Sequence, residues 1–168
     1  MVHMDDRAHH LEIIVLNAIQ NFNENEKYLI ENDLSERCIC AKFAMYLSAA
    51  LSSTDFKDYI VDVEYNRGCD GYERGVKRID NRPITVDLIV HKRGFDCNYG
   101  FDNLICIEMK KSTNRRGCKS DEERLKQMTS INHGFCYVIG FMLLIDMREK
   151  FLIIKSKIIE GKKFPNNA

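Results

Sequence analysis

Two short apolar runs, each interrupted by an acidic residue, constrain the fold of this chain more than any other feature. The first spans residues 85–91 and carries Asp87, and the second spans residues 104–110 and carries Glu108. Both runs are almost continuous in valine, isoleucine and leucine, which is typical of strands covered on both faces. An α/β domain with a buried sheet is therefore expected, and 168 residues suffice to bury such a core in one domain.

The remaining hydrophobic periodicity predicts the order of the other elements. The predicted elements are two helices (6–22 and 33–51), three strands (59–66, 84–91 and 104–109), a helix (120–128) and two strands (135–145 and 151–158). Asp33 with Glu36, and Ser120 with Glu123, have the spacing of capping boxes at two helix starts. We expect a single domain over 1–168, with an N-terminal helical part (5–51) and a core sheet (59–158).

The net charge is zero, but the charges are unevenly distributed along the chain. Residues 1–64 hold 5 basic and 12 acidic side chains, residues 65–120 hold 12 and 7, and residues 121–168 hold 8 and 6. A basic central block can face a polyanion, although such unevenness also arises by chance. The overall balance excludes a chain that coats nucleic acid with its whole surface.

Cysteine content and apolar stretches indicate the compartment. There are seven cysteines, no CxxC pair and no N-terminal apolar run of the signal-peptide kind, so we expect reduced thiols in a cytoplasmic protein. No cysteine pair has the spacing of a zinc or iron–sulfur site. The longest apolar stretches, 135–145 and 151–154, are shorter than the roughly 20 residues of a bilayer span, so we expect no membrane partner.

The acidic and basic residues inside the apolar runs are the candidate site. If the two runs form an antiparallel hairpin that closes around Lys92 and Asn103, Asp87 lies directly opposite Glu108. Lys110 shares the face of Glu108 because residues two apart in a strand point the same way. Two facing carboxylates repel each other unless a cation intervenes, so the pattern is consistent with a divalent-metal site. A solvated strand end explains the same residues without any site.

Glu36 extends this set from the helix before the first strand. It shares the inward stripe of that helix with Ile39 and Phe43, and a carboxylate there needs a partner or a function. The alternative is that Glu36 only completes the capping box with Asp33.

Taken together, these residues resemble the motifs of the PD-(D/E)XK nuclease superfamily, which has the restriction-endonuclease-like fold. The resemblance rests on Asp87 followed 21 residues later by Glu108, Met109 and Lys110, with Glu36 upstream, and it covers about 35–141. Val86 stands where the family has proline. The resemblance implies a mixed α/β (α+β) core of helix, three strands, helix and strand, here with an extra N-terminal helix and a C-terminal strand.

The resemblance also implies a chemistry. Asp87, Glu108 and the main-chain carbonyl of Met109 would hold Mg²⁺ or Mn²⁺, ions that prefer oxygen ligands. Glu36 would approach the ion directly or through water, and Lys110 would orient the attacking water. The implied activity is metal-dependent hydrolysis of phosphodiester bonds in DNA or, as a second choice, RNA.

Basic residues around this site are candidate contacts to nucleic-acid phosphates. They are Arg67, Lys77, Arg93, Lys111, Arg115 and Arg116. The sequence shows no second recognition domain, which favours a homodimer or a component of a larger defence, repair or mobile-element system. The alternative function is a non-catalytic module that keeps the nuclease fold and binds nucleic acid or protein.

Overall fold

The computed structural model describes residues 4–70, 73–79, 81–93, 102–114 and 116–165. Its helices are α1 (Met4–Asn25), α2 (Lys27–Glu31), α3 (Glu36–Ser52) and α4 (Cys118–Thr129), with a 3-10 turn at Ile131–His133. Its strands are β1 (Ile60–Val63), β2 (Arg67–Asp70), β3 (Glu73–Val76), β4 (Arg78–Ile79), β5 (Arg82–Pro83), β6 (Leu88–His91), β7 (Asn103–Lys111), β8 (Ile139–Asp146), β9 (Phe151–Ile159) and β10 (Lys162–Pro165).

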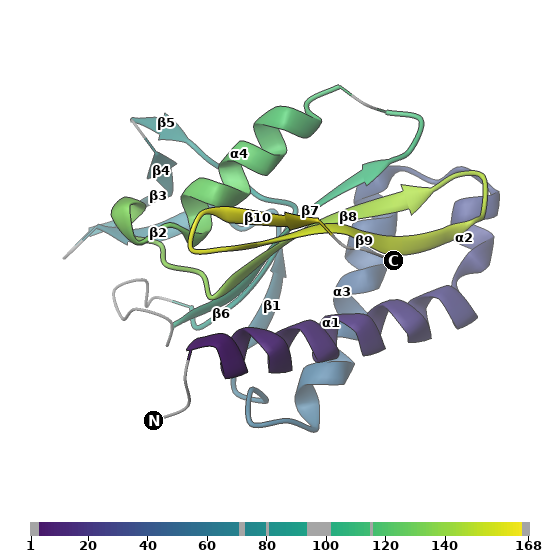
Figure 1. Cartoon of the computed structure of the whole chain (residues 1–168), viewed down its shortest axis with the longest axis horizontal. Helices are drawn as coiled ribbons and strands as arrows, with labels where there is room; N and C mark the ends of the chain where they lie inside the picture. The colour runs from purple at the N-terminus through teal and green to yellow at the C-terminus, as the bar shows by residue number, and fades with distance from the viewer. Residues whose placement is uncertain (1–3, 71–72, 80, 94–101, 115, 166–168) are drawn as a thin grey trace.

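Six strands form one mixed sheet in the order β1-β6-β7-β8-β9-β10, and the other four form two small hairpins. Strands β7 and β8 are parallel, whereas every other neighbouring pair in the large sheet is antiparallel. A parallel pair needs a long crossover connection, and here α4 lies within it (Figure 1). The predicted α/β class with a mixed sheet is therefore confirmed.

Helices cover both faces of the large sheet, as the continuous apolar strands predicted. Helices α1 and α3 pack on one face, where the side chains of Leu88, Ile107 and Phe141 contribute to a core cluster. Helix α4 packs on the other face, where Ile89 and Cys106 belong to a second cluster (Figure 1). Alternate residues of one strand thus enter opposite layers. Among the described residues, no helix is both long and apolar enough to cross a membrane.

A glycine sets the distance between α4 and the sheet. A Cβ atom at Gly140 of β8 would lie 3.3 Å from both Cys106 Sγ and Thr129 Cγ2, and 3.5 Å from Leu125 Cβ. These contacts are tight for a buried position, so the absence of a side chain lets α4 approach β8 closely. The position of α4 matters because this helix contributes to the candidate site described below.

The predicted elements are present, but several of their boundaries were wrong. Strand β6 begins only at Leu88, and the segment 84–87 before it is irregular although Ile84 and Val86 are buried. Helix α4 begins at Cys118 with Gly117 as its N-cap, and Ser120 instead donates a hydrogen bond to the Gly117 carbonyl. The short elements α2, β2 to β5 and β10 were not predicted.

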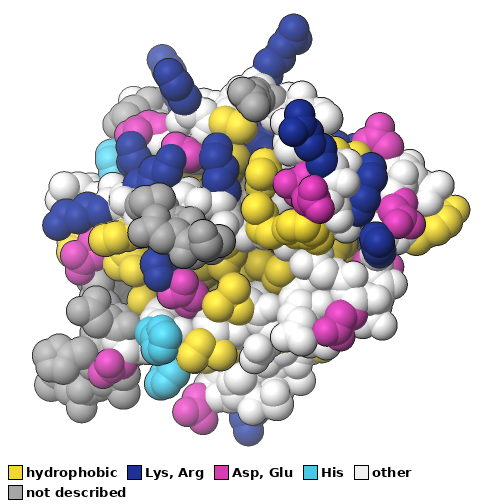
Figure 2. Space-filling model, turned by 45° about the vertical axis from the view of Figure 1, so that its right-hand side comes forward, with side chains coloured by type: hydrophobic (Ala, Val, Ile, Leu, Met, Phe, Trp, Pro, Cys, Tyr) yellow, Lys and Arg dark blue, Asp and Glu magenta, His cyan; other side chains and the backbone are white. Residues whose placement is uncertain are grey.

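The side of the molecule turned toward the reader in Figure 2 combines two kinds of surface. Lysine and arginine side chains gather along its upper part, and hydrophobic side chains form a band across its middle. Exposed apolar side chains of the molecule include Ile13 and Leu16 of α1 and Phe164 of β10. An apolar groove between α1 and β9, lined by Leu16 and Ile153 among others, lies away from the candidate site.

Candidate active site

The register of β6 and β7 places Asp87 across from Glu108. Leu88 pairs with Ile107 and Ile89 with Cys106, which is the predicted register. Beyond Val90 the register shifts, so that His91 and not Lys92 pairs with Asn103. Asp87 directly precedes Leu88, the first residue of β6, and its Oδ2 accepts a 2.8 Å hydrogen bond from the main-chain N–H of Met109. The two carboxylates consequently lie side by side on the α4 side of the sheet.

Burial and proximity make this carboxylate pair resist ionisation. Glu108 is only 2% exposed, and burial together with the neighbouring Asp87 charge raises its pKa to about 9. Burial also raises the pKa of Asp87, although the Met109 N–H bond acts in the opposite direction. A positive charge placed between the two carboxylates would therefore be strongly favoured.

Lys110 lies two residues beyond Glu108 and faces two further carboxylates. Its Nζ is 3.3 Å from Asp121 Oδ2 and 3.8 Å from Glu36 Oε2. Partial burial lowers the pKa of Lys110, but the charges of Asp121 and Glu36 outweigh this effect and raise it above its usual value. The side chain is thus held as an ammonium ion at neutral pH.

Asp121 and Arg124 of α4 complete the site and were not predicted. Arg124 Nε donates to Glu108 Oε1 and its Nη2 donates to Asp121 Oδ1, both at 2.5 Å. Asp121 is 4% exposed, and its Oδ2 forms the 3.3 Å ion pair with Lys110 Nζ. A sequence signal was available, because Asp121 lies four residues before Leu125 and seven before Met128, on the inward stripe of the helix.

Glu36 reaches the site instead of capping its own helix. The N-cap of α3 is Ser35, whose hydroxyl oxygen accepts from the Cys38 N–H, so the predicted capping role of Asp33 was wrong. Glu36 Oε1 accepts a 3.0 Å hydrogen bond from the main-chain N–H of Lys111. Glu36 is therefore fixed to the end of β7, next to Lys110, whose side chain extends toward Asp121 of α4.

The donor chemistry of the site suits a hard divalent cation. Within the described residues, no three or more His, Cys, Asp or Glu side chains are arranged to hold a metal ion. Mg²⁺, however, usually retains several waters and takes only one or two carboxylates from a protein. Asp87 and Glu108 supply that number, and the buried Asp121 carboxylate, paired with Lys110, is a further oxygen acceptor nearby. The residues therefore fit such an ion.

The predicted phosphate contacts fall into different surroundings. Arg67 and Arg116 are exposed, and Arg115 lies outside the described residues. Arg93 forms two hydrogen bonds with Asp62, and Lys111 Nζ lies 2.6 Å from Asp33 Oδ1, so both charges are already paired.

Lys77 requires a correction, because the structure places it inside the protein. It is 3% exposed and donates a 2.7 Å hydrogen bond to the hydroxyl of Tyr137. The rings of Tyr65, Phe135 and Tyr137 lie with their centroids 5.1 to 5.9 Å from its Nζ. Aromatic faces stabilise this ammonium ion, which is not available to a polyanion.

Comparison with known proteins adds no family to these observations. No protein-family model matches the chain, and no curated protein and no solved structure gave a match. The resemblance of the motifs to a nuclease superfamily thus stays a hypothesis. Any function has to be inferred from the side chains gathered around Asp87, Glu108 and Lys110.

Proposed function

We propose that this chain is a divalent-metal-dependent nuclease with a restriction-endonuclease-like core. The observation that carries the proposal is the arrangement of Asp87, Glu108 and Lys110 on one face at the ends of adjacent strands. The topology supports it, because a helix, three antiparallel strands, a helix and a parallel strand follow one another in α3, β1, β6, β7, α4 and β8.

The bound Mg²⁺ or Mn²⁺ would polarise the scissile phosphate and supply a nucleophilic water at neutral pH. Asp87, Glu108 and the Met109 carbonyl would hold the ion. Lys110, kept protonated by Asp121 and Glu36, would donate hydrogen bonds to the attacking water and offset the charge that builds on the phosphate oxygens. Since the ammonium is stabilised in place, we assign Lys110 an orienting role and not that of a general base.

The proposal is tested by incubating the protein with labelled single-stranded DNA, double-stranded DNA and RNA, in Mg²⁺, in Mn²⁺ and in EDTA. We expect cleavage that needs the metal and that falls at least about 100-fold in Asp87→Asn and in Lys110→Ala. Glu149→Gln, an exposed carboxylate in the β8–β9 turn, is the matched control and should cut like the wild type. Cleavage that persists in Asp87→Asn would contradict the assignment.

A second candidate is a binding module that keeps the fold without catalysis. The Arg124 side chain favours this alternative, because it already neutralises Glu108 and Asp121 in a hydrogen-bonded network that needs no metal. In that case no substrate is cut under any metal condition. Nucleic-acid or protein binding would then survive the Asp87→Asn and Lys110→Ala substitutions.

A further inference from the structure

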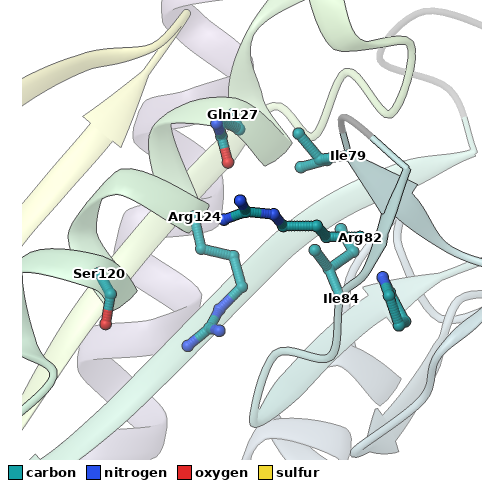
Figure 3. A pocket seen from close by; sticks show the side chains of 7 residues that line it. Ile79, Arg82, Ile84, Ser120, Arg124 and Gln127 are labelled. Carbon is teal, nitrogen blue, oxygen red and sulfur yellow. The ribbon is translucent and has the colours of Figure 1, made fainter.

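A polar cleft opens beside the carboxylate site, between the β4–β5 hairpin and α4. It encloses about 440 Å³, and the residues that line it are Ile79, Arg82, Pro83, Ile84, Ser120, Arg124 and Gln127. Figure 3 shows the guanidinium of Arg82 reaching toward α4 and the side chain of Arg124 turning away toward the sheet. The cleft and the carboxylate site thus share Arg124.

The charge in this cleft favours an anion. None of the described residues that line it is acidic, and of its two arginines Arg124 is paired with Glu108 and Asp121, so the unpaired charge is that of Arg82. Arg82 is exposed, and no hydrogen bond or ion pair joins its guanidinium to any described residue. A free guanidinium offers a planar fork of N–H donors that matches the oxygens of a phosphate group.

One neighbouring side chain adds donors to the same space, because Arg124 turns toward the sheet and is bonded to Glu108 and Asp121. Gln127 lies one helical turn further along α4, and its amide group can donate to an anion held by Arg82. The cleft therefore combines one uncommitted cation, Arg82, with the neutral amide donor of Gln127 on α4.

We propose that this cleft binds one phosphate group of a nucleic-acid chain, next to the scissile phosphate that a metal ion held by Asp87 and Glu108 would engage. The identification of the ligand as nucleic acid rests on the proposed function, whereas the preference for phosphate rests on Arg82 and its neighbours. Arg82 is the principal contact. It fixes the position of the chain along the site without reading its bases.

The test measures binding without catalysis. Fluorescence anisotropy with labelled single- and double-stranded DNA is recorded in EDTA at several salt concentrations. We expect Arg82→Ala to weaken binding about tenfold, and to lower the slope of log affinity against log salt by about 0.9. Arg82→Lys should lie in between, because it keeps the charge and loses the fork. Arg148→Ala, which removes an exposed charge from the β8–β9 turn, should bind like the wild type.

The outcomes separate this inference from the proposed function. Equal affinity of Arg82→Ala and wild type, or an equal loss in Arg148→Ala, overturns the inference even if the wild type cuts DNA. Binding that depends on Arg82 in a protein that cuts nothing supports the inference and contradicts the nuclease assignment.

A parallel measurement distinguishes the source of the phosphate. Thermal unfolding is followed with and without inorganic phosphate. Stabilisation that depends on Arg82, in a protein that binds no oligonucleotide, would overturn the assignment to nucleic acid and indicate a small phosphate compound. Oligonucleotide binding that inorganic phosphate weakens in the wild type, and less in Arg82→Ala, supports the proposal.

Discussion

Glu108 occupies the least favourable surroundings for a charge in the described site. In the folded chain the pKa of Glu108 is about 9, whereas that of an ordinary glutamate is 4.5. Between these values the folded state binds more protons than the unfolded state, so stability falls as the pH rises. Below pH 4.5 both states are protonated and the effect disappears.

The difference between the Glu108 pKa of the folded and of the unfolded chain predicts how stability changes with pH in the absence of divalent ions. Between pH 5 and 9, the wild type should lose at least about 1.4 kcal/mol more of its free energy of unfolding than Glu108→Gln, which imitates the protonated form. For a chain of this length that difference is about 4 °C in Tm. Urea unfolding at a series of pH values in EDTA measures it. Glu123→Gln, an exposed residue of α4, is the control, and identical pH profiles for wild type and Glu108→Gln would refute the expectation.

The candidate site was predictable where strand geometry decides the outcome. The pairing of Asp87 with Glu108 followed from the hairpin register, because alternation leaves few ways to bury both apolar runs. The arginine at position 124 was not predicted, since its contact with Glu108 depends on how α4 crosses β7, and local sequence does not determine that crossing. The burial of Lys77 was missed for a similar reason, because the aromatic rings around it come from two segments far apart in the sequence, Tyr65 and residues 135–137.

At the scale of elements, the start of α3 decides where Glu36 points. The helix is capped by Ser35, while Asp33 has φ of 55° and bonds to Lys111 instead. The observed cap lies two residues after the predicted one, and the side chain of Asp33 is bonded to Lys111 of β7. Long periodic segments were therefore predicted well, and their ends were not.

The assignment of Ser35 as the N-cap of α3 predicts that substitutions at positions 35 and 33 change the stability of the protein by unequal amounts. Ser35→Ala should destabilise the protein by about 1 kcal/mol, because the Cys38 N–H loses its partner. Asp33→Gly removes an exposed ion pair without strain at the left-handed φ of 55° and should change stability by at most about 0.5 kcal/mol. Chemical denaturation measures both values. A larger effect of Asp33→Gly than of Ser35→Ala would contradict the assignment of Ser35 as the cap.

At the scale of the whole molecule, the first helix is fastened to a strand near the other end of the chain. Asn23 donates a 2.9 Å hydrogen bond to the Leu152 carbonyl and accepts a 2.7 Å bond from the Leu152 N–H. Lys157 Nζ also lies 2.7 Å from Glu12 Oε2. These contacts tie α1 to β9 and should make the domain unfold as one unit.

The two hydrogen bonds between the Asn23 side chain and the main chain of Leu152 predict a measurable contribution to the free energy of unfolding. Asn23→Ala leaves both main-chain groups of Leu152 without this partner and should destabilise the protein by about 1–3 kcal/mol. Asn21→Ala, which removes an exposed bond to the Asn17 carbonyl of the same helix, should change stability by less than about 0.5 kcal/mol. Thermal denaturation of the two variants gives the comparison. Equal Tm values would contradict the role of Asn23.

The contact between Asn23 and Leu152 also sets an order of events during synthesis. The two residues are separated by 129 positions, and a ribosome adding roughly 10 residues per second needs about 13 s to make the second after the first. During that interval α1 can pack only against earlier elements such as α3, and β9 does not yet cover it. The carboxylate site is also completed late, because Asp121 and Arg124 are synthesised long after Glu36. A nascent chain would therefore carry no assembled site until most of the protein had been made.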